Sequence, residues 1–182
     1  ALAELNYSNA GTLEFLFQDG AFYFIEMNTR IQVEHPITES VTGIDLVKLQ
    51  LSFASTGRLS LLQSDVCFSG HAMECRINAE DRNFQPAPGA VNQYRTPGGP
   101  GIRLDSHLYP GYIVPHQYDS LLAKVISTGS DRAECIARME RALVEFVIGP
   151  VSTNIDLQRL ILRDVRFRSG ELDTHFLEGM EK

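Results

Sequence analysis

The 182-residue sequence lacks the features that mark several common classes of protein. It has no Lys/Arg cluster and a formal net charge of −7, which argues against a nucleic-acid partner. No apolar run approaches the roughly 18 residues that a membrane-spanning helix needs. The three cysteines, Cys67, Cys75 and Cys135, have no metal-type spacing. We therefore expect reduced thiols in a cytoplasmic compartment.

Familiar catalytic patterns are missing as well. The five histidines show no H-x-x-x-H spacing, so the sequence does not favour a zinc site. No Ser-His-Asp arrangement is visible. The glycine-rich stretch at residues 98–101 lies between two strand patterns and contains a proline, which favours a turn over a phosphate-binding loop.

The strongest positive pattern lies between Gly11 and Glu39. Two segments rich in Phe, Tyr, Leu and Ile meet at Asp19-Gly20, and each contains a carboxylate, Glu14 in the first and Glu26 in the second. A carboxylate inside an apolar strand is costly unless something pairs with it. A divalent cation is one such partner, and a neighbouring Arg or Lys is another.

The turn between the two segments decides whether the carboxylates can act together. A two-residue loop pairs Gln18 with Ala21 and leaves the two carboxylates on opposite faces. A three-residue loop with Gly20 in the left-handed region places them on one face together with Asn28. Two carboxylates and an amide oxygen suit magnesium or manganese. The metal interpretation therefore requires the three-residue loop.

The next residues, 30–35, alternate polar and apolar side chains, which predicts an extended segment with Arg30, Gln32 and Glu34 on one face. The opposite charges of Arg30 and Glu34 can form a plain ion pair. The two residues can also be an anion clamp and a base, because guanidinium binds planar oxyanions through two hydrogen bonds.

Residues 26–39, E-M-N-T-R-I-Q-V-E-H-P-I-T-E, resemble the signature of the biotin carboxylases. These are ATP-grasp enzymes that carboxylate biotin in acetyl-CoA, propionyl-CoA and pyruvate carboxylases. The resemblance continues through H-A-M-E-C-R-I-N-A-E-D, P-G-G-P-G-I-R and Y-D-S-L-L-A-K. It implies an α+β fold, with the C-terminal part of an ATP-grasp domain at residues 1–60 and the biotin carboxylase C-terminal domain at residues 61–182. It also implies a fragment that is inactive alone, because the family has its nucleotide-binding lid upstream.

The resemblance also implies roles for particular residues. Metal ions would be held by Glu14, Glu26 and Asn28. ATP would contact the same two carboxylates together with Leu16 and Ile25, although an ordinary core role fits these two apolar residues equally well. Bicarbonate would be bound by Arg30, Gln32 and the backbone of Val33, with Glu34 as the base that deprotonates it. Arg76 would stabilise enolised biotin.

The implied substrates and cofactors are ATP, Mg²⁺ or Mn²⁺, and biotin. No A-M-K-M attachment motif occurs, so the biotin would lie on a carboxyl carrier protein or domain. The resemblance further implies a carboxyltransferase component and a homodimer of the full-length enzyme. Two alternatives remain: another ATP-grasp ligase, which the Q-V-E-H-P-I-T-E run disfavours, and a non-catalytic structural or regulatory piece.

The remaining patterns predict the secondary structure. A helix is predicted from an N-cap at Thr42 to Gly57, with Ile44, Val47, Leu51 and Ala54 buried, followed by a linker over residues 58–69. Strands are predicted at residues 71–80, 91–96, 102–108 and 121–127. Two helices follow, one capped by Asp131 with Ile136, Met139, Leu143 and Phe146 inward, and one capped by Thr153 with Leu157, Leu160 and Ile161 inward.

Overall fold

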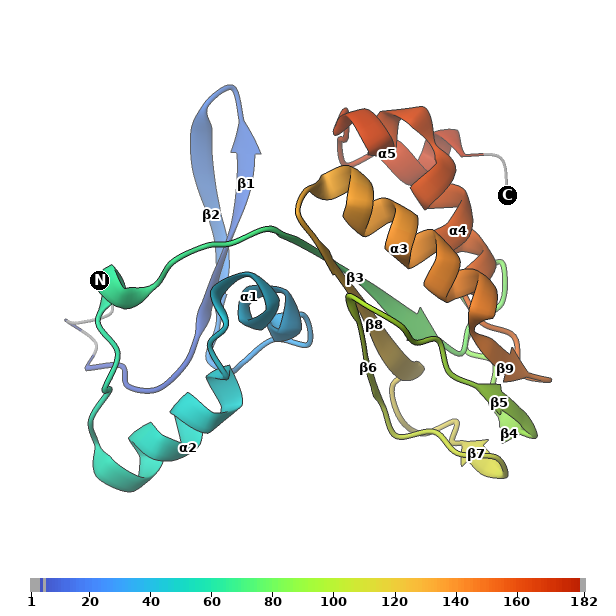
Figure 1. Cartoon of the computed structure of the whole chain (residues 1–182), viewed down its shortest axis with the longest axis horizontal. Coiled ribbons are helices and arrows are strands. Elements are labelled where there is room, and N and C mark those ends of the chain that lie inside the picture. Colours follow the sequence, from blue (N-terminus) through green and yellow to red (C-terminus); the bar gives the residue numbers. More distant parts are fainter. Residues whose placement is uncertain (1–3, 5, 181–182) are drawn as a thin grey trace. The chain divides into compact units, whose positions relative to one another are not determined.

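The computed structural model describes residue 4 and residues 6–180, and the chain divides into two compact units. Unit 1 is Ala1–Ser69 and unit 2 is Gly70–Lys182. The family resemblance implies a boundary a little earlier, between residues 60 and 61. Both units contain helices and strands, so the predicted α+β class is confirmed (Figure 1).

Unit 1 is a β-hairpin followed by two helices. Figure 1 shows the hairpin as a long blue arm that leads into the two cyan helices. The elements are β1 (Thr12–Gln18), β2 (Ala21–Asn28), α1 (His35–Thr42), α2 (Leu46–Thr56) and the short 3₁₀ helix η1 (Gln63–Asp65).

The hairpin turn has two residues and not three. Gln18 pairs with Ala21, and both Asp19 and Gly20 have positive φ, 51° and 79°. Positive φ at both central residues is the type I′ turn, which fits the right-handed twist of a hairpin and favours Asp-Gly. The predicted left-handed Gly20 is confirmed, but the three-residue loop that the metal interpretation required is wrong.

The predicted extended segment at residues 30–35 is also wrong. Val33 and Glu34 lie in a turn, and α1 begins at His35 with Pro36 in its first helical turn. Proline is well tolerated there, because its fixed φ suits a helix and its missing N–H has no helical acceptor to reach. A six-residue alternation was too short to exclude this outcome.

Helix α2 begins later than predicted. Asp45 is the N-cap and its Oδ1 accepts from the Lys48 N–H at 2.8 Å, whereas Thr42 is the last residue of α1. Gly57 ends the helix in the left-handed conformation, as predicted. Val47 and Leu51 of the predicted buried stripe are 43% and 69% exposed, so that stripe is not a core among the described residues.

Unit 2 is built on the antiparallel sheet β3-β8-β6, with α3 packed against it (Figure 1). The short strand pairs β4-β7 and β5-β9 and the C-terminal helices complete the unit. The bounds are β3 (His71–Asn78), β4 (Gly89–Val91), β5 (Gln93–Arg95), β6 (Ile102–Ser106), β7 (Tyr112–Val114), β8 (Leu121–Gly129), α3 (Arg132–Glu145), β9 (Val147–Gly149), α4 (Ile155–Arg163), α5 (Val165–Ser169) and the 3₁₀ helix η2 (Phe176–Gly179). The four predicted strand regions are confirmed, with the second divided into β4 and β5, while the short β7 and β9 were not predicted.

The hydrophobic core of the described chain lies in unit 2. Cys75 and Ile77 of β3, and Ala79 directly after it, alternate inward and are at most 4% exposed. The predicted stripe of α3 meets them, with Ile136, Met139, Leu143 and Phe146 all buried. Asp131 caps α3 as predicted, since its Oδ1 accepts from the Glu134 N–H at 2.8 Å.

Helix α4 differs from its predicted form. Its N-cap is Asn154 and not Thr153, and Asn154 makes no side-chain capping bond. Ile155 and Leu162 are its buried residues, whereas Leu160 is 45% exposed. The buried face of this helix is therefore rotated relative to the predicted one.

Candidate active site

A β-bulge brings the two hairpin carboxylates together despite the two-residue turn. From the turn, the register is regular as far as Phe15 opposite Phe24, and then Glu14 pairs with Glu26, so that Ile25 has no partner in the ladder. One extra residue on one strand reverses the facing of everything beyond it. Glu14 and Glu26 therefore share a face, as the metal interpretation requires, but through a bulge in mid-strand.

Two side-chain amides converge on these carboxylates. Asn28 Nδ2 donates to Glu14 Oε1 at 2.7 Å and to Glu26 Oε1 at 3.2 Å. Gln32 Nε2 donates to the same Glu14 oxygen at 2.5 Å. The cluster thus joins the predicted metal residues directly to a predicted bicarbonate residue, a link that the sequence pattern did not show.

The donor set fits a divalent cation of the magnesium type. Two carboxylates and an amide supply hard oxygen ligands, and only neutral amide donors among the described residues contact Glu14 and Glu26. The alternative partner, a Lys or Arg, makes no ion pair with either carboxylate in the described part of the chain. Within that part, no group of three or more His, Cys, Asp or Glu side chains is placed to hold a metal, so any site here needs ligands beyond acidic residues.

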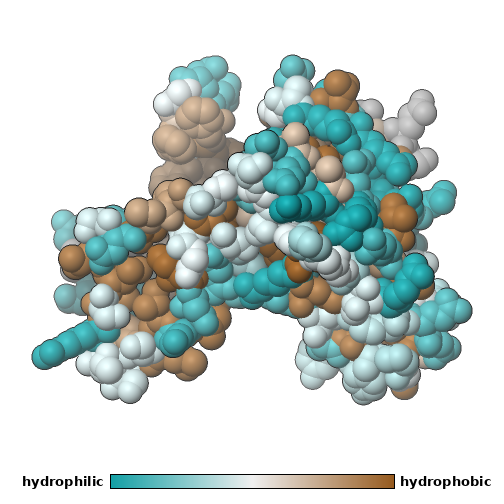
Figure 2. Space-filling view, viewed as in Figure 1, coloured by the Kyte–Doolittle hydropathy of each residue, from teal (hydrophilic) through white to brown (hydrophobic). Residues whose placement is uncertain are grey.

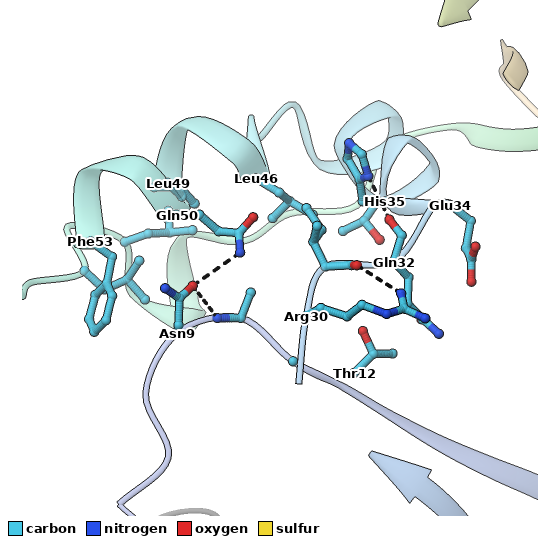
Figure 3. Close-up of a pocket in the computed structure, with 16 residues that line it drawn as sticks. Asn9, Thr12, Arg30, Gln32, Glu34, His35, Leu46, Leu49, Gln50 and Phe53 are labelled. Carbon is cyan, nitrogen blue, oxygen red and sulfur yellow. Dashed lines mark hydrogen bonds between the residues drawn. The ribbon is translucent and has the colours of Figure 1, made fainter. Parts of the chain in front are cut away.

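The loop that follows β2 forms one wall of a cavity of about 470 Å³ within unit 1 (Figure 3). Its polar wall includes Arg30, Gln32, Glu34 and His35. Its apolar wall comes from α2 and the segment after it, with Leu46, Leu49, Phe53, Leu59 and Leu61. In Figure 3 the side chains of Arg30 and Gln32 lie close together, while Phe53 and Leu49 stand at the opposite end.

Backbone-directed hydrogen bonds shape this loop. His35 Nδ1 is 2.8 Å from the carbonyl oxygen of Gln32, and Arg30 Nη1 donates to the carbonyl of Ile31 at 3.2 Å (Figure 3). Glu34 is exposed and stands at the N-cap of α1 without capping it. Arg30 and Glu34 therefore line one cavity, which brings together the predicted clamp and base.

The remaining predicted residues are placed as follows. Leu16 and Ile25 are 53% and 52% exposed on the hairpin, so neither belongs to a closed core in the described chain. Val33 is in the turn before α1 and is not among the residues that line the cavity. Arg76 is an exposed residue of β3 and belongs to unit 2.

Charged residues surround Arg76 on the open face of its sheet. Arg76 pairs in register with Lys124 of β8, which pairs in turn with Asp105 of β6. Asp105 accepts two hydrogen bonds from Arg103, at 2.8 and 2.9 Å, and Lys124 Nζ lies 3.4 Å from Asp105 Oδ2. The Arg103 guanidinium is the main reason that the pKa of Asp105 is lowered.

Comparison with known proteins identifies the family. Residues 74–179 match the family model of the biotin carboxylase C-terminal domain. The chain belongs to the biotin carboxylase family. Residues 1–62 match the ATP-binding domain of the carbamoyl-phosphate synthase L chain, in agreement with the ATP-grasp assignment of unit 1.

Similar proteins are biotin carboxylases or parts of related carboxylases. Biotin carboxylase of Pseudomonas aeruginosa is 53% identical over all of this chain, which spans 41% of its length. A pyruvate carboxylase subunit of Methanothermobacter thermautotrophicus is 53% identical over 96% of the chain, which spans 36% of its length. The chain therefore spans well under half the length of these relatives.

Solved structures agree with the biotin carboxylase fold. The biotin carboxylase domain of a thermophilic 2-oxoglutarate carboxylase bound to bicarbonate is 44% identical, with a TM-score of 0.94 over 97% of this chain and 41% of that one. Biotin carboxylase from Campylobacter jejuni, in complex with β,γ-ATP, is 39% identical, with a TM-score of 0.92 over 98% of this chain and 40% of that one.

Across residue 4 and residues 6–180, no helix is long and apolar enough to cross a membrane.

Proposed function

We propose that this chain supplies part of the active site of a biotin carboxylase, which uses ATP and bicarbonate to carboxylate biotin through carboxyphosphate. The observation that carries the proposal is the hydrogen bond from Gln32 Nε2 to Glu14 Oε1. It joins a residue of the anion-binding loop to a metal-type carboxylate, and phosphoryl transfer to bicarbonate needs both groups in one place. The bicarbonate and β,γ-ATP named for the similar solved structures support these ligands.

Glu14, Glu26 and Asn28 would hold Mg²⁺ or Mn²⁺ on the polar face of the hairpin. When bound, the metal would neutralise the negative charge of the ATP phosphates. Asn28 would turn its amide so that the oxygen, and not Nδ2, faces the ion, which needs only a rotation about its terminal bond. Leu16 and Ile25 would contact the adenine, and their exposure on the hairpin is compatible with that role.

Arg30, Gln32 and the backbone of Val33 would bind bicarbonate at the N-terminus of α1. This end of a helix attracts anions because its N–H groups and its dipole point toward them. Glu34 would take the proton of bicarbonate as one bicarbonate oxygen attacks the terminal phosphorus of ATP. The bond to ADP breaks in the same step, and ADP and carboxyphosphate are formed.

Arg76 would stabilise the negative oxygen of enolised biotin by electrostatic attraction. The biotin would be carried by a carboxyl carrier protein or domain, and the carboxylated product would pass to a carboxyltransferase component. We also propose that the full-length enzyme is a homodimer and that it works in a reducing compartment such as the cytoplasm. The free thiols of all three cysteines are compatible with that compartment.

The division of labour between Glu34 and Arg76 tests the proposal in the full-length enzyme. Glu34→Gln keeps the shape of the side chain but removes the base, so bicarbonate-dependent ATP cleavage without biotin should fall by about 10²–10⁴-fold. Arg76→Ala should lower carboxybiotin formation by roughly 10²–10³-fold, by analogy with loss of an oxyanion donor, and leave that ATP cleavage near its wild-type rate. Both rates should be measured for each variant. Equal loss of ATP cleavage in the two variants would show that the assigned roles are wrong.

The 182-residue chain by itself should be inactive. Phosphoryl transfer depends mostly on positioning, and the chain spans only 41% of the length of the Pseudomonas relative. An assay of bicarbonate-dependent ATP hydrolysis on the purified chain should therefore give no rate above the blank. A measurable rate would show that residues 1–182 contain a complete phosphate-binding site.

A further inference from the structure

Asn154, at the start of α4, makes contacts that its position in a helix does not explain. An Asn at an N-cap ordinarily accepts a hydrogen bond from an N–H of the first helical turn. The side chain of Asn154 makes no such bond. Its amide is used elsewhere, which costs α4 the stabilisation that capping supplies.

The partner of Asn154 is the backbone of β3 on either side of Ile77. Asn154 Nδ2 donates to the carbonyl of Arg76 at 3.1 Å, and Asn154 Oδ1 accepts from the Asn78 N–H at 3.0 Å. The Asn154 N–H itself donates to the carbonyl of Asn78 at 3.2 Å. One residue therefore holds three successive outward-facing groups of the strand.

These groups would otherwise lie on an open sheet edge. β3 is at the edge of the order β3-β8-β6, so alternate peptide groups of β3 face away from β8. The Asn154 amide carries one donor and one acceptor side by side, as a peptide group does, and it occupies the place of a missing neighbouring strand. The backbone that Asn154 holds, residues 76–78 of β3, includes Arg76.

A second contact fixes the other end of this segment. Asn78 Nδ2 donates to Glu80 Oε1 at 2.9 Å, and Ser120 Oγ donates to the same oxygen at 2.6 Å. On its sheet-facing side, Arg76 has Lys124 as its register partner. The carbonyl of Arg76 is thus held by Asn154, and β8 flanks the other side of the strand, while the Arg76 side chain is exposed.

We infer that Asn154 is a positioning residue for Arg76, holding the arginine backbone where its guanidinium meets the negatively charged ureido oxygen of biotin. This inference rests on the proposed function of Arg76. Asn154 does not touch the substrate and acts through the strand. Its effect is therefore confined to the biotin half-reaction.

The test compares variants of the full-length enzyme. Asn154→Ala should lower kcat/KM for biotin carboxylation by about 10–100-fold, the loss expected from a displacement near 1 Å. Bicarbonate-dependent ATP cleavage without biotin should stay at the wild-type rate. Hydrogen exchange at the Asn78 amide should become faster, which reports the loosened strand without any catalytic assay. Asn154→Asp, which keeps the acceptor but loses the donor to Arg76, should also lower the biotin rate and carries the test if Asn154→Ala does not fold.

Two controls separate positioning from general destabilisation. Asp131→Ala removes a comparable side-chain-to-backbone bond at the start of α3 and should leave the biotin rate unchanged. In an Arg76→Ala background, Asn154→Ala should have no further effect on the biotin rate, because residues that act through one another are not additive.

The outcomes distinguish the inference from the function on which it rests. If Arg76→Ala lowers the biotin rate but both Asn154 variants do not, the positioning role is overturned and the function of Arg76 stands. The same holds if Asn154→Ala lowers the rate equally with and without Arg76. If Arg76→Ala itself leaves the biotin rate unchanged, both the role of Arg76 and the inference about Asn154 are overturned.

Discussion

At the scale of single residues, burial separates the chemistry of the three cysteines. Cys67 is exposed, whereas Cys75 and Cys135 are buried. Burial is the main cause that raises the pKa of the Cys75 thiol to about 12, with the negative charge of Glu74 as a second cause. Burial also raises the pKa of Cys135, whose Sγ donates to the carbonyl of His71 at 3.0 Å.

Thiol labelling of the native chain should therefore modify Cys67 alone. The reactive form is the thiolate, and a buried thiol with a raised pKa supplies almost none of it near pH 8. Mass spectrometry after brief treatment with iodoacetamide should find one modified cysteine, and treatment in denaturant should find all three. A Cys67→Ser chain is the control and should remain unlabelled until it unfolds. Rapid native labelling of Cys75 would contradict its place in the core.

The amide of Gln32 shows at the same scale how one contact joins two functions. The family resemblance implies a bicarbonate role for Gln32 and a metal role for Glu14, as two separate sites. The 2.5 Å hydrogen bond between them makes the two sites neighbours. No pattern along the chain could show this, because the residues are 18 positions apart and meet only through the bulge at Ile25.

At the scale of elements, the turn before β6 shows how a glycine can be required by packing as well as by φ. Gly101 has φ +74°, and a Cβ there would lie 2.7 Å from the carbonyl oxygen of Thr128 in β8. The Thr128 N–H donates to the Gly101 carbonyl at 2.8 Å, so the turn is docked on the sheet. The predicted turn at residues 98–101 is confirmed by its conformation, with the Ile102 N–H bonded to the carbonyl of Gly99.

Gly101→Ala should lower the free energy of unfolding by about 2–4 kcal/mol, combining left-handed strain with a clash against backbone. Gly98→Ala is the matched control in the same turn, since its Cβ would meet nothing within 4 Å and its φ is not left-handed. That control should change stability by no more than about 1 kcal/mol, in either direction. Urea unfolding of both variants measures the difference. Equal effects would mean that the turn is not docked on β8 as described.

At the scale of the whole molecule, the two units differ in how much hydrophobic core each contains. The buried hydrophobic core residues of the described chain all lie in unit 2; the first of them is Cys75 and the last is Leu162. In unit 1, Phe15, Phe17 and Phe22 are 46%, 64% and 71% exposed on one face of the hairpin. Figure 2 shows the same contrast, with hydrophobic side chains gathered over unit 1 and a mainly hydrophilic visible surface on unit 2.

Residues 70–182 should therefore fold alone, and residues 1–69 should not. A domain needs enough buried apolar surface to offset its conformational entropy, and exposed apolar patches lead to association. Circular dichroism should show a single cooperative thermal transition for 70–182 and no cooperative transition, or aggregation, for 1–69. A cooperative, monomeric 1–69 would show that the hairpin and its two helices are a sufficient core by themselves.

The sequence by itself determined the features that depend on neighbours along the chain. The motif at residues 26–39 identified the family, the alternation of β3 identified its buried face, and Asp131 with its stripe defined α3. Asp19-Gly20 required a left-handed turn. In each case the physical cause, periodicity, capping or φ preference, acts over a few residues.

Only the tertiary structure decided features that depend on residues meeting from distant positions. The bulge at Ile25 is set by which residues of β1 and β2 pair, and it, not the turn, places Glu14 beside Glu26. The side chain of Asn154 does not cap α4, because its amide forms hydrogen bonds with the open edge of β3 instead. Hydrogen-bond partners and strand registers are chosen by competition among contacts across the fold. A pattern read along the sequence contains the candidates for these contacts, but not the result of that competition.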